Sequence, residues 1–171
     1  MLQAREHPEF MTATCLEWKP LIESDTHKEI IIDSLRYMKA KEWVLILGFV
    51  LMGNHFHLIW QMIGDHRRMN VQRDFMKYIG QRILSSLKKN APMAAAELRV
   101  DTSDRKYQVW ERNSLGIPLT KERFLIQKLN YIHNNPVKAG LCKYPEEYKY
   151  SSARFYICNE KDWDFLFHYK G

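Results

Sequence analysis

The chain has 171 residues, which suits one domain with a single hydrophobic core and is too short for two well-buried domains. Hydrophobic residues make up 46% of the sequence and aromatic residues 13%, which argues against a disordered protein. Lysine and arginine number 26 against 20 acidic residues, and the net charge of +6 favours a polyanionic partner. We expect one domain over residues 1–171.

Cysteine usage and hydropathy bear on the compartment. Cys15, Cys142 and Cys158 are widely spaced and form no CxxC pair, which indicates neither a disulfide framework nor a thiolate zinc site. The longest apolar run, residues 43–52, is too short to span a bilayer. These features predict a cytoplasmic protein that does not enter a membrane.

The first predicted elements are a strand and a helix. Apolar and β-branched residues alternate from Glu9 to Trp18, as they do in strands, and Pro20 ends this run. Ser24 or Asp25 can cap the next segment, 26–42, whose apolar residues recur at helical spacing beneath a charged face. This pattern predicts an amphipathic helix.

A strand hairpin is expected next. Residues 43–52 and 55–62 are strand-like runs joined by a turn at 53–54. Because side chains alternate along a strand, His55 and His57 project from the same face near the turn. The two imidazoles can therefore offer ring nitrogens to one cation. The pair alone does not decide between a metal site and an incidental spacing.

A long helix follows over about residues 66–89, where apolar side chains form a stripe at three- and four-residue spacing. Its outer face is basic and carries Arg67, Arg68, Arg73, Lys77, Arg82, Lys88 and Lys89. Such a face either contacts the phosphates of a nucleic acid or is exposed to solvent without a partner.

The next predicted features are a connection, a short strand, a turn and a helix. Residues 90–106 have the composition of a connection, and 107–110 have that of a short strand. A turn is expected through 116–118. Thr120 can cap a helix that Pro136 ends, because the residue before a proline is disfavoured in helical angles.

The predicted order is strand, helix, strand, strand, helix, strand, helix. It matches an α+β, ferredoxin-like split βαβ sandwich, in which an antiparallel sheet has helices on one face, with a C-terminal helix and tail added. The tail after Pro136 is aromatic and basic. It either stacks unpaired bases or packs over the sheet.

The last predicted helix carries a second candidate cluster. Tyr131 and Asn135 are four residues apart and share one helix face, so a nucleophile and an oxygen ligand could arrive together. Alternatively, Tyr131 packs in the core and Asn135 satisfies the helix end. His133 points away from Tyr131 on such a helix, and Glu111 is either a carboxylate that orients a ligand or a surface ion-pair partner.

Two segments, LMGNHFHLIW (51–60) and NYIHNNPVKAGL (130–141), carry a family resemblance. In this order and on this succession of elements, they resemble the HUH single-tyrosine transposases of bacterial insertion sequences, the IS200-like family. The closer likeness is to REP-associated tyrosine transposases. The resemblance extends over nearly the whole chain.

The resemblance implies a ferredoxin-like fold, a histidine pair that holds Mg²⁺ or Mn²⁺, and a helix tyrosine that cuts single-stranded DNA. His55 and His57 then bind the metal, and Tyr131 forms a 5′-phosphotyrosine while a 3′-hydroxyl is freed. The third ligand in the family lies four positions after the tyrosine and is often glutamine, so Asn135 takes its place. The implied partners are DNA with a hairpin, either REP-like or a terminal palindrome, and a second copy of the chain.

These features predict a DNA transposase that cuts and rejoins single-stranded DNA at hairpin-flanked sites. One alternative is a catalytically silent or domesticated hairpin-binding protein derived from such an enzyme. Another is a metal-dependent hydrolase that uses the histidine pair in a (β/α)₈ barrel. Length argues against that barrel, because it typically needs about 250 residues.

Overall fold

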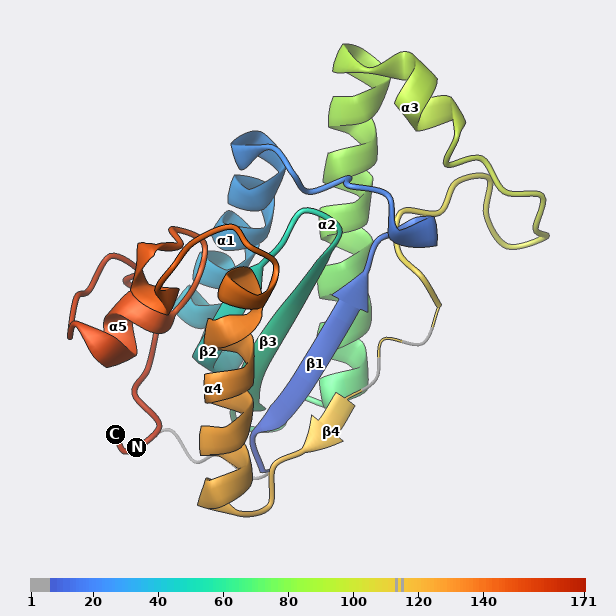
Figure 1. Ribbon diagram of the computed structural model, residues 1–171. Coiled ribbons are helices and arrows are strands. Elements are labelled where there is room, and N and C mark those ends of the chain that lie inside the picture. Colours follow the sequence, from blue (N-terminus) through green and yellow to red (C-terminus); the bar gives the residue numbers. More distant parts are fainter. Residues whose placement is uncertain (1–6, 113, 115) are drawn as a thin grey trace.

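The computed structural model describes residues 7–112, 114 and 116–171 (Figure 1). The strands are β1 (Glu9–Thr14), β2 (Val44–Leu51), β3 (His55–Met62) and β4 (Gly116–Pro118). The α-helices are α1 (Asp25–Ala40), α2 (Arg68–Asn90), α3 (Pro92–Ala96), α4 (Glu122–Lys138) and α5 (Ala153–Ile157). Two short 3₁₀ helices are η1 (Leu16–Trp18) and η2 (Pro145–Glu147).

The four strands form one antiparallel sheet in the order β2-β3-β1-β4. β2 and β3 form the expected hairpin, and β1 lies between β3 and β4. This is the ferredoxin-like, α+β arrangement that the sequence predicts. The register places Thr12 of β1 opposite His57 of β3, and Thr14 opposite His55.

Helices cover the two faces of the sheet differently. α1 and α2 lie on one face, and α4 crosses the other (Figure 1). The face under α1 and α2 is the larger core, centred on fully buried side chains that include Met11, Phe49, Phe56, Leu58 and Trp60. The smaller core under α4 contains Phe10, Val50, Ile59, Leu129 and Ile132. The sheet face that carries the histidines is therefore the one that faces α4.

A glycine brings α4 close to the sheet. The pairing of β2 with β3 shifts register between Ile46 and Gly48. A Cβ atom at Gly48 would lie 2.6 Å from Cδ2 of Leu129 and 3.3 Å from Cδ1 of Ile132. Because real Cβ atoms essentially never come within 3.0 Å of another atom, a side chain at position 48 would force the Leu129 side chain to shift.

The fourth strand differs from the prediction. It is β4, at 116–118, where the sequence predicts a turn, and residues 107–110 make only the isolated bridges Arg99↔Tyr107 and Cys15↔Trp110. β4 exists because three of its backbone positions pair with the edge of β1, with Ile117 opposite Phe10. Pro118 is tolerated because it lies on an edge strand, where a missing N–H breaks no central ladder.

The limits of α4 also differ from the prediction. The helix begins after Lys121, not Thr120, and continues through Pro136 to Lys138. Pro136 has no N–H for the Ile132 carbonyl, but it lies in the last turn, which other backbone bonds close. The Ala139 N–H still donates to the Asn135 carbonyl at 3.0 Å. Similarly, the first strand ends at Thr14, and η1 occupies the segment predicted as its continuation.

The C-terminal tail packs along β2. The Ser152 N–H donates to the Phe49 carbonyl at 3.0 Å, and the Leu51 N–H donates to the Tyr150 carbonyl at 2.9 Å. The hydroxyl of Tyr148 donates to Leu51 O at 2.7 Å. These bonds cover backbone groups that an open sheet edge would expose. The packing role of the tail, one of the two predicted, is thus the one observed in this chain.

Within the described ranges, every helix is too short or too polar to cross a membrane.

Candidate active site

The two histidines lie together at the start of β3, on the sheet face that α4 covers. Their ring centroids are 5.1 Å apart. His57 is only 5% exposed and stacks on Phe10 at 5.2 Å, whereas His55 is partly buried and borders solvent. The side-by-side placement of the imidazoles that the strand alternation predicts is confirmed.

Each ring has a hydrogen-bond partner at Nδ1. His55 Nδ1 lies 2.7 Å from Asn54 Oδ1, and His57 Nδ1 lies 2.8 Å from the hydroxyl of Thr12. When Nδ1 of His55 donates to the amide oxygen, its Nε2 keeps a free lone pair. Partners of this kind fix the orientation of metal-binding histidines. Both Nε2 atoms are therefore the ones available to a cation.

Both imidazoles are held neutral. Burial, together with the smaller effects of the nearby His55 and Lys128, lowers the pKa of His57 to about 3. Burial also lowers the pKa of His55 from its usual 6.5. A metal needs unprotonated ring nitrogens, so the environment prepares these rings for ligation.

Tyr131 lies beside the histidines on α4. Its ring centroid is 5.4 Å from that of His57 and 6.1 Å from that of Phe10. The side chain is 43% exposed, so Tyr131 is not the core residue that the alternative interpretation expects. The tyrosine thus borders both the histidine pair and solvent.

Two lysines flank Tyr131. The Nζ atoms of Lys128 and Lys138 lie 5.3 Å and 5.7 Å from the centroid of its ring. Both lysines line an open pocket of about 320 Å³, with Tyr131 and the polar side chains Gln127, Asn130 and Asn134. The charges and size of this pocket suit a phosphate group. Sequence reasoning missed these lysines, although their spacing from Tyr131, three before and seven after, puts them on the same helix face.

Asn135 completes the cluster, with its amide nitrogen 3.4 Å from Nε2 of His55. A half-turn of the amide exchanges its nitrogen for the oxygen that a cation requires. The structure thus brings together Tyr131, His55, His57 and Asn135, which the sequence singled out.

The residues present fit a divalent cation in an open site. Two Nε2 atoms and one amide oxygen form a three-donor set that leaves positions free for phosphate or water, as catalytic sites do. Among residues 7–112, 114 and 116–171, no group of three or more His, Cys, Asp and Glu is arranged to hold a metal ion, so the third donor here is the Asn135 amide. Imidazole nitrogens suit Mn²⁺ better than Mg²⁺, which prefers oxygen ligands.

Other candidate residues lie outside this cluster. The carboxylate of Glu111 accepts a hydrogen bond from the Glu17 N–H at 2.6 Å. Nε2 of His133 is 2.8 Å from the hydroxyl of Ser152, on the side of α4 away from Tyr131, as predicted. The basic helix α2 covers the opposite sheet face (Figure 1), and Arg68 there pairs with Glu9 at 3.1 Å.

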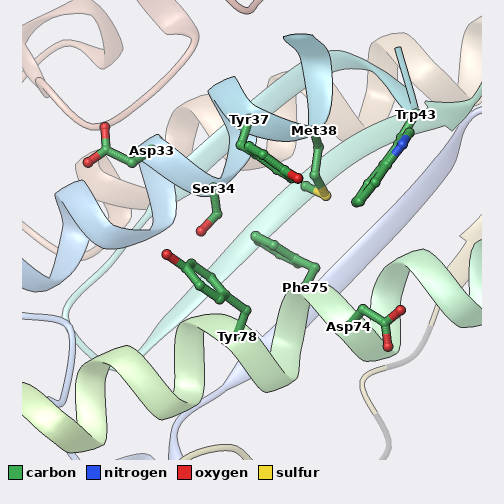
Figure 2. A pocket seen from close by; sticks show the side chains of 8 residues that line it. All are labelled: Asp33, Ser34, Tyr37, Met38, Trp43, Asp74, Phe75 and Tyr78. Atoms are coloured by element: carbon green, nitrogen blue, oxygen red, sulfur yellow. The ribbon is translucent and has the colours of Figure 1, made fainter. Parts of the chain in front are cut away.

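A larger pocket, of about 650 Å³, lies between α1 and α2 and is lined by Asp33, Ser34, Tyr37, Met38, Trp43, Asp74, Phe75 and Tyr78. Figure 2 shows the aromatic side chains that line it and the two aspartates at its sides. None of the clustered site residues lines it, because it opens on the other side of the sheet. Its mostly apolar lining offers no arrangement of catalytic groups.

Comparison with protein-family models and with curated proteins found no match for this chain. Among solved structures, the chain is similar to a REP-associated tyrosine transposase bound to a REP hairpin. The TM-score is 0.66 at 17% identity, over 90% of this chain and 80% of that one. A candidate transposase from Deinococcus radiodurans R1 gives a TM-score of 0.47 at 14% identity, over 74% of this chain and 88% of that one. The chain therefore has the fold of a REP-associated tyrosine transposase.

Proposed function

We propose that the chain is a single-tyrosine transposase that cuts and rejoins single-stranded DNA. The observation that carries the proposal is the convergence of Tyr131, on α4, with His55 and His57, on β3, in one cluster. These residues are 70 or more positions apart in the sequence, and Tyr131 also lines an open pocket that carries Lys128 and Lys138. The fold shared with a tyrosine transposase agrees with this assignment.

The chemistry starts with a phosphodiester, which is anionic and repels nucleophiles. Lys128 and Lys138 attract it to the pocket beside Tyr131. His55, His57 and Asn135 would hold Mn²⁺ or Mg²⁺, which supplies charge withdrawal from the phosphate oxygens when bound.

Tyr131 then attacks phosphorus through its phenol oxygen. The new bond joins that oxygen to the 5′-phosphate, and the bond from phosphorus to the 3′-oxygen breaks. The phenol proton passes to water, and the departing 3′-oxygen takes up a proton. Because the phosphotyrosine keeps an ester bond, a 3′-hydroxyl can attack it and rejoin DNA without ATP.

The substrate and assembly are also part of the proposal. The similar transposase is bound to a REP hairpin, and we propose that this chain likewise binds a hairpin, with the cut made in adjacent single-stranded DNA. We also propose a homodimer, which sedimentation equilibrium at micromolar concentration would test. A monomer at these concentrations would contradict it.

Covalent capture tests the function. The protein is incubated with Mn²⁺ and a library of DNA stem–loops that carry randomised single-stranded flanks, and denaturing gels reveal DNA that stays on the protein. We expect an adduct with the native protein, none with Tyr131→Phe, and strongly reduced yield with His57→Ala. Tyr78→Phe, at a 53% exposed tyrosine on α2, is the matched control and should leave the yield unchanged.

Two outcomes would contradict the proposal. An adduct that survives Tyr131→Phe would assign the nucleophile elsewhere. Hairpin binding without an adduct in the native protein would instead identify a catalytically silent hairpin-binding protein.

A further inference from the structure

An exposed tryptophan lies at the edge of the candidate site, across the histidines from Tyr131. Trp18 is 61% exposed, and its ring centroid is 5.8 Å from that of His55. The rings follow one another from Trp18 to His55, His57 and Tyr131, at successive centroid distances of 5.8, 5.1 and 5.4 Å. A molecule that binds at the histidines therefore has an aromatic surface beside it.

The backbone that presents Trp18 is strained. Glu17 and Trp18 have φ values of 52° and 56°, in the left-handed region that favours glycine. Such a conformation carries a steric cost for a residue with a side chain, and a strained turn persists only where its surroundings hold it in place. Burial of the indole does not offset this cost, because most of the ring faces solvent.

Hydrogen bonds from two other segments hold this turn. The Glu17 N–H donates to the Glu111 carboxylate at 2.6 Å, and the Leu16 N–H donates to the Val109 carbonyl at 2.8 Å. The Cys15 N–H donates to Asn54 O at 2.8 Å, next to the asparagine side chain that orients His55. The turn is thus fixed to the strand ends that carry the metal-binding rings, and Trp18 has a defined position relative to them.

We propose that Trp18 is a stacking platform for a base of single-stranded DNA next to the linkage bound at Tyr131. This assignment rests on the proposed function and names a positioning residue for it. A rigid, exposed indole offers a face to any base, which suits a strand whose phosphates are held by charge. Glu111 takes part indirectly, because its carboxylate holds the turn that presents Trp18.

The test separates base stacking from structural support. Binding is measured by fluorescence anisotropy in a Tyr131→Phe background, where no adduct forms. The two probes are a single-stranded oligothymidylate and an abasic phosphodiester chain of equal length. Trp18→Ala should weaken oligothymidylate binding by about 5- to 150-fold and leave abasic-chain binding unchanged.

Three further variants sharpen the result. Trp18→Phe should retain much of the preference for the base-bearing strand, because a smaller aromatic ring still stacks. Trp18→Leu should behave like Trp18→Ala, although it keeps an apolar side chain. Tyr37→Ala, at a 55% exposed aromatic residue on α1, is the control and should change neither affinity.

Equal weakening of both probes by Trp18→Ala would assign Trp18 to support of His55 and overturn the inference. An unchanged affinity for oligothymidylate would also overturn it. Because binding is measured without Tyr131 chemistry, these results are distinct from a failure of covalent capture. If the native protein forms an adduct at Tyr131 but its affinity for oligothymidylate does not depend on Trp18, the proposed function stands and only the role of Trp18 is wrong.

Discussion

Individual side chains of the site depend on partners that hold them in place. His57 is almost fully buried, yet it is a polar ring, and its Nδ1 is hydrogen-bonded to Thr12. Burying a polar group without a partner is costly, so the threonine hydroxyl both satisfies and orients the ring. Each imidazole therefore depends on a neighbour in the sheet or turn.

Thr12→Val tests this dependence. The change keeps the shape of the side chain and removes the hydroxyl 2.8 Å from His57 Nδ1. We expect the affinity for Mn²⁺ to fall by about 10- to 100-fold, as it does when partners of metal ligands are lost. Titration followed by the electron paramagnetic resonance of free Mn²⁺ measures this. Thr12→Ser keeps the hydroxyl and should keep most of the affinity, and equal affinity in all three proteins would contradict the role of Thr12.

The pH dependence of Mn²⁺ binding follows from the same environment. An ordinary imidazole is protonated as the pH falls through 6.5, and protons then compete with the metal. The pKa of His57 is lowered to about 3 and that of His55 is lowered from 6.5, so protons compete with the metal at a lower pH than they do for ordinary imidazoles. Calorimetric titration should show little loss of affinity as the pH falls to about 6. A steep loss that begins above 6.5 would contradict the lowered pKa values.

Some residues of the site could be predicted from the sequence, and others could not. His55, His57, Tyr131 and Asn135 could be selected because strand and helix periodicities give their faces and because two motifs occur together. Thr12 could not, because its place opposite His57 depends on the strand register between β1 and β3. Register depends on packing across the whole sheet and not on local sequence.

At the scale of elements, the position of α4 on the sheet decides where Tyr131 lies. The helix packs on β2 through Leu129 and Ile132, and Gly48 gives it room to do so. Tyr131 lies between these two contacts in the sequence. A small shift of α4 would therefore move Tyr131 relative to the histidines.

Gly48→Ala tests the close packing of α4. Its Cβ would lie 2.6 Å from Cδ2 of Leu129, so the helix or the side chain must move. We expect a loss of about 1–3 kcal/mol in the free energy of unfolding. Adduct formation should fall by up to about 100-fold, since a displacement near 1 Å has that effect in enzymes.

The double variant Gly48→Ala/Leu129→Ala supplies the control for this prediction. Removal of the Leu129 methyl groups makes room for the new Cβ, so the two losses in unfolding free energy should sum to more than the measured loss. Strictly additive losses, measured by urea unfolding, would show that the Leu129 side chain does not contact the new Cβ at position 48.

The elements themselves were largely predictable. Periodicity identified α1, α2, the β2–β3 hairpin and the body of α4, because each has a long amphipathic or alternating pattern. It failed at β4 and at the C-terminal end of α4. β4 is three residues long and exists through pairing with β1, and Pro136 is accommodated because it lies in the last helical turn. Both the strand β4 and the end of α4 therefore depend on the folded structure and not on local sequence periodicity.

At the scale of the whole molecule, one chain brings all four candidate residues together. Asn135 and Tyr131 on α4 reach His55 and His57 of the same chain, at 3.4 Å between the amide and His55 Nε2. The sequence left open whether the helix serves its own histidines or those of a second copy. The geometry of this chain favours a site made within one molecule.

Mixing two inactive variants tests this arrangement. His57→Ala retains the tyrosine, and Tyr131→Phe retains the histidines. If each site is made within one chain, a mixture of the two has no complete site and should yield no more adduct than either alone. Recovery of a quarter to a half of the native adduct yield after mixing would show that α4 acts on the histidines of a second copy.

Peptide mapping of the DNA adduct tests most directly whether the tyrosine of α4 and the histidines of β3 act on one phosphodiester. After digestion with trypsin and nuclease, mass spectrometry should find a nucleotide joined through its 5′-phosphate to the peptide of residues 129–138, which contains Tyr131 as its one tyrosine. The amount of modified peptide should fall strongly in His55→Ala and His57→Ala digests. A nucleotide on any other tyrosine peptide, or one whose amount does not depend on the histidines, would contradict the account.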